Sequence, residues 1–343
     1  MRRYTSLLFV AFILVLLLVA GNTYLASYAD QVEENKTAKQ MVVYTTLPIE
    51  QAAALGTAFE KTSHIKVNFL PLGQKELLQK LNTADREAAA DVVLADRETL
   101  EKAAAVHAFS AYTSEQADLV ADELKDASSL WVGTWYDPFV FCANKDYLRT
   151  LPAIPETWDE LADTRNIRIG ITDFLAADAS ADLLFTLIAE TDEAKTFVWL
   201  KKLHPQVVQY AKYLSTPVRM AGMGEVDISI ALQSEAIRYI NEGFPLTLIY
   251  PANGTACQLT GAAIVQNAPD GTAAREFVRW LLDDDAQQAL QKANFFFVPT
   301  NHETLAYKTF SGKNLVLFKN HSDLTAVQKH AVLDRWVKNI RLK

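Results

Sequence analysis

Cysteine, histidine and glycine are all scarce in this sequence of 343 residues. The two cysteines, Cys142 and Cys257, are too few for a thiolate metal cluster, and the six histidines show no metal-ligand spacing such as H-E-x-x-H. The sequence also lacks a G-x-S-x-G nucleophile elbow and a glycine-rich phosphate loop. We therefore predict no catalytic residues, no metal and no cofactor, and we expect the protein not to be an enzyme.

Glycine and proline number only 12 and 11, while half of the residues are hydrophobic, and this balance excludes wholesale disorder. A chain of 343 residues is too long for one compact core. The composition therefore predicts a globular protein with two domains or lobes.

Charge is missing from the N-terminal run Leu7–Ala20, which follows Arg2 and Arg3 and precedes the small residues Ser27–Ala29. This order is typical of a secretory signal peptide over residues 1–29, and an uncleaved membrane anchor is the alternative. Residues 30–40 are polar and form a predicted linker. We expect a periplasmic or extracellular protein, tethered to the membrane if the segment is not cleaved.

Removal of this segment takes two arginines from the 33 basic side chains, which leaves 31 against 41 acidic ones and a formal charge of −10. Such a surface repels nucleic acid, so we predict no nucleic-acid partner. Export also permits a disulfide between Cys142 and Cys257, with two buried free thiols as the equal alternative.

Strand-like and helix-like segments alternate from residue 41 onward, which predicts a mostly parallel sheet flanked by helices. A predicted helical stretch, Ala103–Asp126, follows the first unit, and the pattern restarts after Leu130–Cys142. The predicted segments of the first unit are Met41–Thr45, Ile49–Thr62, Ile65–Phe69, Gln74–Ala84 and Asp91–Ala95; those of the second are Trp158–Asp163, Ile167–Ile171, Ser180–Glu190, Asp192–Leu203, Val207–Tyr213 and Val226–Ala231.

Two β-prone stretches, Leu130–Cys142 and Phe244–Val265, connect these units, and we interpret them as the outward and return crossings of a hinge. After them come a predicted covering helix, Gly271–Gln291, and an amphipathic tail helix, Leu324–Ile340. The predicted division is lobe 1 at 41–137, lobe 2 at 138–256, and a return to lobe 1 with C-terminal helices at 257–343.

Ligands of such sheets lie beyond the carboxyl ends of the strands, where helices begin. Hydroxyl, amide and carboxylate groups there suit a polyol, a sugar or a cationic organic solute, and helix N-termini could still hold a phosphate. For each residue the alternative is helix capping, turn formation or core packing. The candidate ligand-binding residues are Thr45, Thr46, Asp96, Tyr136, Asp173, Ser180, Ser215, Gln233, Ser234, Glu235, Asn253 and Thr255.

Several short stretches, taken in order, resemble one known family. They are Val43–Thr46, Ala90–Val93, Trp131–Gly133, Pro155–Leu161, Gly224–Ile230, Tyr250-Pro251 with Gly254-Thr255, Ala273–Gln291 and Leu333–Trp336. From residue 41 onward the chain is similar to the type 2 periplasmic solute-binding proteins of ABC transporters, in the branch of iron(III), phosphonate and hexose-phosphate binders.

The resemblance implies two α/β lobes joined by hinge strands, a solute in the cleft, and an ABC transporter permease as partner of a monomer. The alternative is a membrane-tethered sensor that presents its closed form to a histidine kinase or a chemoreceptor. Iron binders of the branch carry a Tyr-Tyr pair where this chain has Gln233-Ser234-Glu235, and organophosphate binders carry Ser-His-Asp there. We therefore expect an organic solute, namely a sugar, sugar phosphate, phosphonate or cationic organic molecule.

Overall fold

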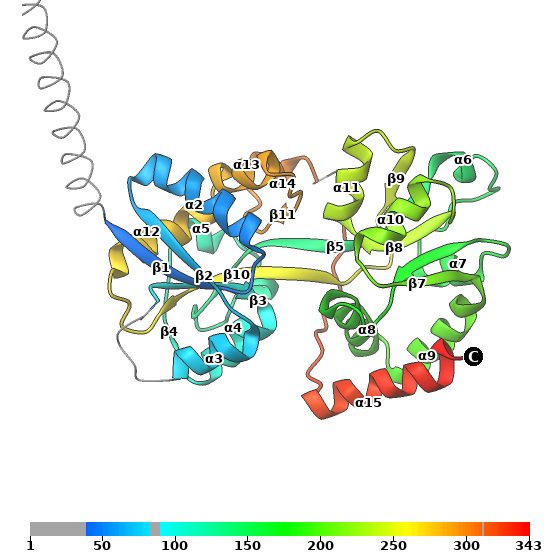
Figure 1. Cartoon of the computed structure of the whole chain (residues 1–343), viewed down its shortest axis with the longest axis horizontal. Helices are drawn as coiled ribbons and strands as arrows, with labels where there is room; N and C mark the ends of the chain where they lie inside the picture. The colour runs from blue at the N-terminus through cyan, green and yellow to red at the C-terminus, as the bar shows by residue number, and fades with distance from the viewer. Residues whose placement is uncertain (1–38, 83–89, 311) are drawn as a thin grey trace, which may run out of the picture.

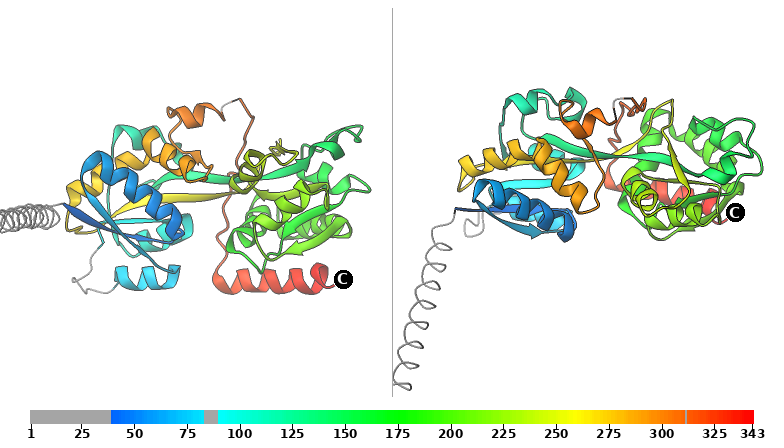
Figure 2. Two further views of the ribbon diagram at one scale, coloured as in Figure 1. Left: turned by 45° about the horizontal axis from the view of Figure 1, so that its top comes forward. Right: turned by 90° about the horizontal axis from the view of Figure 1, so that it is seen from above.

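The computed structural model describes residues 39–82, 90–310 and 312–343. Figure 1 and Figure 2 show two lobes side by side, each with a sheet and surrounding helices, joined by strands that run from one lobe to the other. The predicted two-lobe α/β fold is thus confirmed. The predicted leader or anchor lies outside the described residues. The tethered-sensor alternative depends on that segment and therefore stays a prediction. Within the described ranges, no helix is long and apolar enough to cross a bilayer.

Three parallel strands open lobe 1, and they lie in the spatial order β2, β1, β3. A helix follows each strand, as the alternating pattern predicts, and Asp96 ends β3 and caps the next helix through its side chain. These elements are β1 (Gln40–Thr45), α2 (Ile49–Ser63), β2 (Lys66–Pro71), α3 (Gln74–Asn82), β3 (Val92–Asp96) and α4 (Arg97–Ala105).

Strand β5 (Val132–Asn144) belongs to both lobes because its two halves pair with different neighbours. Its first half lies antiparallel to β10 (Cys257–Val265), with Cys257 opposite Pro138, and its second half pairs with lobe 2 strands. Strand β10 in turn pairs with β3. All 13 residues of β5 are buried, so the outward crossing also forms the centre of the molecule.

Lobe 2 repeats the parallel pattern, with β8 between β5 and β6, and β7 beyond β6. Helices cover this sheet, and each parallel strand ends toward lobe 1 because β8 runs antiparallel to β5. The elements are α6 (Lys145–Leu148), α7 (Trp158–Asp163), β6 (Ile169–Thr172), α8 (Asp178–Glu190), α9 (Glu193–Leu203), β7 (Val207–Ala211), α10 (Ser215–Gly222), β8 (Ile228–Leu232), α11 (Gln233–Asn241) and β9 (Leu246–Ile249).

Each lobe has its own aromatic core. In lobe 1 the ring of Phe277 lies 4.9 Å from that of Phe59 and 5.9 Å from that of Trp280, measured between centroids. In lobe 2 the Trp158 ring lies 4.9 Å from Phe141 and 5.6 Å from Trp199. Buried aromatic pairs of this kind add stability beyond their buried area, so each lobe is held by contacts of its own.

The C-terminal part of the chain visits both lobes. In lobe 1 it forms α12 (Gly271–Leu281), α13 (Asp284–Lys292), β11 (Val298–Pro299) and α14 (Leu305–Lys308). It ends in lobe 2 with α15 (Ala326–Trp336) and a π-helical segment (Val337–Arg341). Residues 312–325 make a third crossing, where Thr255 bonds through its backbone to Val316 and Phe318. Trp336 is fully buried in lobe 2 and packs on Phe174. The sequence did not predict this third crossing.

Two predicted helices differ from the structure. The stretch Ala103–Asp126 is mostly irregular, with only the end of α4, the short strand β4 (Phe109–Ser110), α5 (Glu115–Asp118) and a 3-10 turn. Helix Gly271–Gln291 is two helices, because the chain bends at Asp283 and a second helix starts at Asp284. The run of three acidic residues at 283–285 suits a helix start better than a helix interior.

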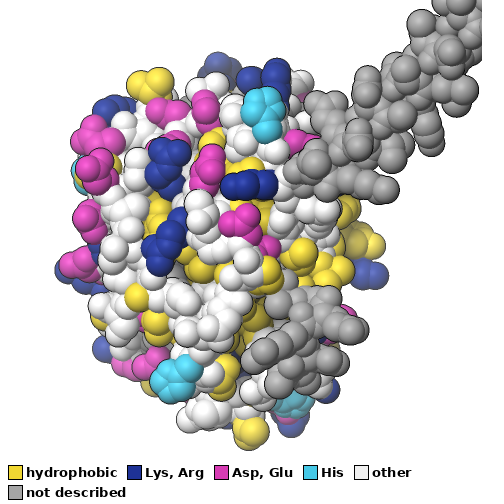
Figure 3. Space-filling view, turned by 90° about the vertical axis from the view of Figure 1, so that its left-hand side faces the viewer, with side chains coloured by type: hydrophobic (Ala, Val, Ile, Leu, Met, Phe, Trp, Pro, Cys, Tyr) yellow, Lys and Arg dark blue, Asp and Glu magenta, His cyan; other side chains and the backbone are white. Residues whose placement is uncertain are grey.

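The surface carries charges of both signs. Figure 3 views the end of lobe 1 and shows Lys and Arg interspersed with Asp and Glu, with apolar side chains between them. The net acidic charge is therefore not gathered on this face.

Candidate functional site

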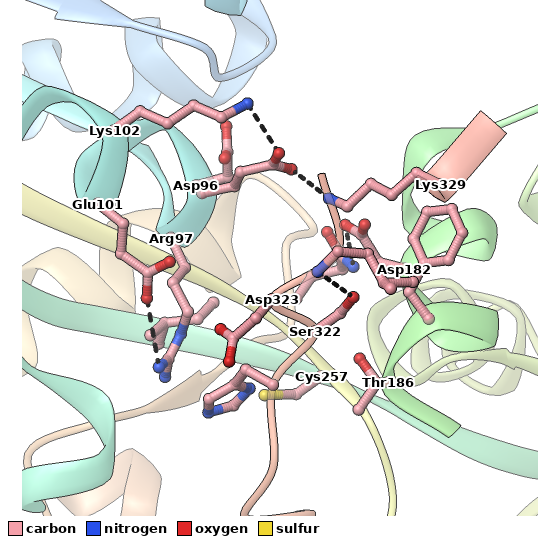
Figure 4. Close-up of a pocket in the computed structure, with 16 residues that line it drawn as sticks. Asp96, Arg97, Glu101, Lys102, Asp182, Thr186, Cys257, Ser322, Asp323 and Lys329 are labelled. Atoms are coloured by element: carbon pink, nitrogen blue, oxygen red, sulfur yellow. Dashed lines mark hydrogen bonds and ion pairs between the residues drawn. The ribbon is translucent and has the colours of Figure 1, made fainter. Parts of the chain in front are cut away.

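A cavity of about 300 Å³ lies between the two lobes. Its walls come from α4 in lobe 1, α8 and α15 in lobe 2, the start of β10 and the third crossing (Figure 4). The polar residues of this lining include Asp96, Lys102, Asp182, Gln258, Ser322 and Lys329. Because both lobes contribute, a molecule held here touches the two halves that a hinge would move.

Asp96 brings two predicted residues together at the edge of this cavity. Its Oδ2 accepts hydrogen bonds from Thr99 Oγ1 at 2.8 Å and Thr46 Oγ1 at 3.2 Å, and its Oδ1 accepts from the Thr99 backbone at 2.9 Å. Thr45 has turned inward instead, where its buried hydroxyl donates to the Leu94 carbonyl at 2.7 Å. Thr46 and Asp96 therefore lie at the predicted rim, and Thr45 supports it from inside.

Asp182, on the second turn of α8, was missed from the sequence. Its Oδ2 accepts from Gln258 Nε2 at 3.3 Å, and the described part of the chain gives it no ion pair. The pKa of Asp182 is raised to about 6, chiefly by burial; the Gln258 hydrogen bond and the Lys329 ammonium oppose the rise, and the carboxylates Glu98 and Asp96 add to it. A signal existed in the spacing, because Asp178 starts α8 and Asp182 lies one turn later on the same face.

Three cations also line the cavity, and each already has a partner. Arg97 Nη2 donates to the Glu123 carbonyl at 2.7 Å. Lys102 and Lys329 both bind the carboxylate of Glu98, with N···O distances of 2.8 and 3.0 Å. The two lysines thus share one carboxylate, whereas Asp182 has no ion pair among the described residues and accepts a hydrogen bond from the Gln258 amide.

The lining also contains the carboxylates Glu101 and Asp323, and two further titratable groups, His321 and Cys257. Burial and the nearby Arg97 guanidinium lower the pKa of His321 to about 4, so its imidazole is neutral at pH 7. Burial raises the pKa of the Cys257 thiol to about 12. At neutral pH these two side chains add no charge to the cavity.

Three predicted residues, Gln233, Ser234 and Glu235, form the first turn of α11. Gln233 is fully buried: its Oε1 accepts from Tyr250 Oη at 2.7 Å, and its Nε2 donates to the Phe296 carbonyl of lobe 1 at 3.3 Å. Glu235 forms an ion pair with Arg238 on the same helix. The segment therefore ties α11 to the hinge region.

Asp137 on β5 completes this network. Its carboxylate accepts from the Ser234 backbone at 3.0 Å and from the Ser234 hydroxyl at 2.5 Å. Complete burial raises the pKa of Asp137 to about 7, although the Ser234 hydrogen bonds oppose the rise and Glu235 adds to it. A carboxylate at a helix N-terminus stabilises the first turn, so Asp137 fixes α11 to the crossing strand.

Other predicted residues also have structural partners. Asp173 forms an ion pair with Arg341 at 3.0 Å and accepts from the Leu175 backbone at 2.8 Å. Ser180 is buried and donates to the Asp173 carbonyl at 2.8 Å. Ser215 is the first residue of α10. Their role as ligand residues stays a prediction.

The remaining three lie in or beside the crossing strands. Asn253 Oδ1 accepts from the Trp158 backbone at 3.4 Å, and the buried Thr255 hydroxyl donates to the Phe139 carbonyl at 2.8 Å. Tyr136 packs in the lobe 1 core, and burial raises its pKa. These contacts hold the crossing strands and their turn in place.

A second cavity, of about 600 Å³, is larger but is lined by lobe 2 elements, Asn253 and Phe318 of the third crossing. Trp158 and Trp199 form its apolar wall, and their indole N–H groups donate to backbone carbonyls at 2.8 and 2.7 Å. Of these two cavities, the smaller one is the better candidate for the solute site, because its walls come from both lobes.

Of the two alternatives for Cys142 and Cys257, the disulfide is wrong for this structure, in which both thiols are free. The register places Cys257 opposite Pro138, and Cys142 lies four residues further along β5. At about 3.3 Å per residue the two cysteines are about 13 Å apart, well beyond the roughly 7 Å that a disulfide can bridge. The crossings do run side by side, but with an unsuitable register.

Among residues 39–82, 90–310 and 312–343, no group of three or more His, Cys, Asp or Glu side chains is arranged to hold a metal ion.

The model of the family described as bacterial extracellular solute-binding protein matches residues 54–316. An uncharacterized protein of Haemophilus influenzae is 25% identical over 319 residues, which cover 88% of this chain and 91% of that one. Iron uptake protein A1 of Synechocystis sp. is 24% identical over 282 residues, covering 76% and 77% of the two chains.

Among solved structures, the periplasmic binding protein AfuA from Actinobacillus pleuropneumoniae, with exogenous fructose-6-phosphate bound, superposes with a TM-score of 0.67. The two are 22% identical, and the match covers 90% of this chain and all of that one. At this identity the likeness supports the two-lobe fold.

Proposed function

The chain belongs to the family of bacterial extracellular solute-binding proteins, and on that premise we propose that it captures a small polar organic solute between its lobes for an ABC importer. Membership in this family confirms the predicted solute-binding role. The observation that carries the proposed site is the interlobe cavity, lined from α4 on one side and α8 on the other. A solute bound there would favour the closed arrangement of the lobes by contacting both.

The charges around the cavity favour a solute that carries hydroxyl groups and a protonated amine. Lys102 and Lys329 share one carboxylate already, whereas Asp182 has only the Gln258 amide as a partner. An ammonium group that reached Asp182 would neutralise it and gain a charge-assisted hydrogen bond. The nearby start of α8 carries Asp178 in its first turn, a carboxylate where an anionic group would otherwise bind. A phosphate is therefore less suited to this site than an amine.

Thermal-shift screening of the full chain tests the proposal. The panel comprises sugars, amino sugars, sugar phosphates, aminophosphonates, polyamines and Fe³⁺. We expect a shift with an amine-bearing organic solute, since a ligand at about 100 times its dissociation constant adds roughly 2.7 kcal/mol to the free energy of unfolding. A shift with Fe³⁺ alone, or with sugar phosphates but no amine, would contradict the proposed solute class.

A matched pair of variants locates the site. Asp182→Asn should weaken binding of the amine about tenfold or more, because a charge-assisted hydrogen bond is lost. Asp159→Asn removes an exposed carboxylate at the other cavity and should leave affinity unchanged. Equal affinities in the two variants would place the solute elsewhere.

A further inference from the structure

The C-terminal helix α15 reaches across the cavity to lobe 1. Lys329 Nζ lies 3.0 Å from Glu98 Oε2 of α4, a contact between residues 231 positions apart in sequence. The same ammonium group lies 5.3 Å from the centroid of the Phe185 ring on α8. Figure 4 shows Lys329 pointing from the α15 side toward the α4 side of the cavity.

The lobe 2 end of this contact is firmly anchored. Val332 and Trp336 of α15 are buried in the lobe 2 core. Arg335 binds Glu193 of α9 through two hydrogen bonds, of 2.6 and 2.9 Å. Helix α15 must therefore move with lobe 2.

The lobe 1 end is equally fixed. Glu98 lies in the first turn of α4, whose N-terminus is capped by Asp96, and Leu100 and Ala103 of the same helix are buried. Lys102 binds the other oxygen of the Glu98 carboxylate, at 2.8 Å, and so holds the acid in place on α4. Because each helix is fixed in its own lobe, any separation of the lobes would lengthen this pair.

We propose that Lys329 is a positioning residue that, by pairing with Glu98 across the interlobe cavity, sets how far apart the two lobes stand. The idea rests on the proposed function, since lobe separation matters here because the solute binds between the lobes. The Lys329 side chain is only 19% exposed, so its charge is screened less than that of a fully solvated lysine. The pair also borders the cavity, so a bound solute would lie beside it.

Pulsed electron paramagnetic resonance of the full chain, without solute, tests this directly. Spin labels at Lys61→Cys on α2 and Lys201→Cys on α9 report the distance between the lobes. The introduced exposed thiols should react selectively, because burial raises the pKa of Cys142 and Cys257 to about 12. Lys329→Glu and Glu98→Lys each place like charges together and should shift the distance distribution to longer values.

Rescue by charge exchange separates the pair from general damage. The double variant Glu98→Lys/Lys329→Glu should move the distribution back toward that of the wild type, because the new repulsion between Lys102 and the residue at position 98 lies within α4 and not between the lobes. Lys329→Met, which keeps an unbranched apolar chain beside Phe185, should give an intermediate shift that salt no longer changes. Lys195→Glu breaks an ion pair within lobe 2, with Asp192, and should leave the distance unchanged. Each single reversal should also weaken binding of any solute from the screen by up to about fivefold.

Unchanged distances in both single reversals would overturn the proposal, and so would a shift that the double variant fails to correct. Because the distances are measured without solute, failure of the solute screen leaves this test intact, and the two ideas fail separately.

Discussion

Two carboxylates near the lobe interface have pKa values far above their usual range, and each has a different structural cause. Asp182 borders the interlobe cavity with an amide as its hydrogen-bond partner, whereas Asp137 is enclosed by the crossing strand and the start of α11. Burial disfavours the charged form in both. Their effects on stability and on function can therefore be separated by pH.

We predict that Asp182→Asn stabilises the solute-free protein at alkaline pH. The raised pKa means that the carboxyl contributes stability below about pH 4, which is lost as the pH rises through about 6. At pH 8 the variant should gain on the order of 1 to 3 kcal/mol in urea denaturation, and at pH 4 it should equal the wild type. A variant that is less stable than the wild type at pH 8 would show that Asp182 is structural. Gained stability with lost affinity would instead mark a residue kept for binding.

Asp137→Asn should also reduce the pH dependence of the free energy of unfolding, over a range that extends to higher pH than for Asp182. The folded pKa of about 7 exceeds the usual value, so the contribution of Asp137 is present in full below about pH 4 and disappears as pH rises through 7. Between these limits the wild type should lose up to about 1.4 kcal/mol per pH unit from this group, and the variant should not. Denaturation curves from pH 5 to 8 measure the difference. Parallel curves for the two proteins would mean that Asp137 titrates in its usual range.

At the scale of elements, the crossing strands depend on a close approach at Gly261 of β10. A Cβ atom there would lie 2.8 Å from the Val132 carbonyl oxygen, and the β5–β10 register shifts between Thr260 and Gly261. Gly261→Ala should therefore lower the free energy of unfolding by about 1 to 3 kcal/mol. Gly73→Ala is the control, since nothing lies within 4 Å of its Cβ position, and it should change stability by less than about 1 kcal/mol. Similar losses in both variants would remove the packing explanation.

Elements with strong local patterns could be predicted from the sequence. The apolar run that became β3 and the Thr157 side-chain cap that starts α7 are local signals. The double role of β5 could not be predicted from local sequence, because its two halves pair with β8 and β10, which are more than 80 residues away in the chain. The third crossing lacks periodic apolar spacing, so the sequence offered no pattern from which to predict it.

The candidate site was predictable only in outline. The predicted strand ends correctly placed Thr46 and Asp96 close together, because parallel strands end at one edge of a sheet. Gln233 and Ser234 also follow a strand end, but their partners, Tyr250 and Asp137, are fixed by tertiary packing. Lys329 and Glu98 meet only because the chain returns to lobe 2, so no spacing rule could have paired them.

At the scale of the whole molecule, the lobes have separate cores and meet through few described polar contacts besides the crossing strands. Gln233 to the Phe296 carbonyl and Lys329 to Glu98 are two of these contacts. Interfaces of this kind allow domains to move and to unfold with partial independence. A core substitution in one lobe should therefore act mainly on that lobe.

We predict that Trp336→Ala opens lobe 2 before lobe 1. Trp336 is fully buried against Phe174, and its loss should cost about 3 to 5 kcal/mol, which would split unfolding into two calorimetric transitions. Phe277→Ala removes a ring of similar burial from lobe 1 and should produce the opposite order. Hydrogen exchange followed by mass spectrometry identifies which lobe opens, because peptides of the weakened lobe should lose protection first. A single transition in both variants, with equal loss of protection in the two lobes, would contradict this prediction. The shared strand β5 would then make the molecule one cooperative unit, and hinge motion would have to proceed without local unfolding.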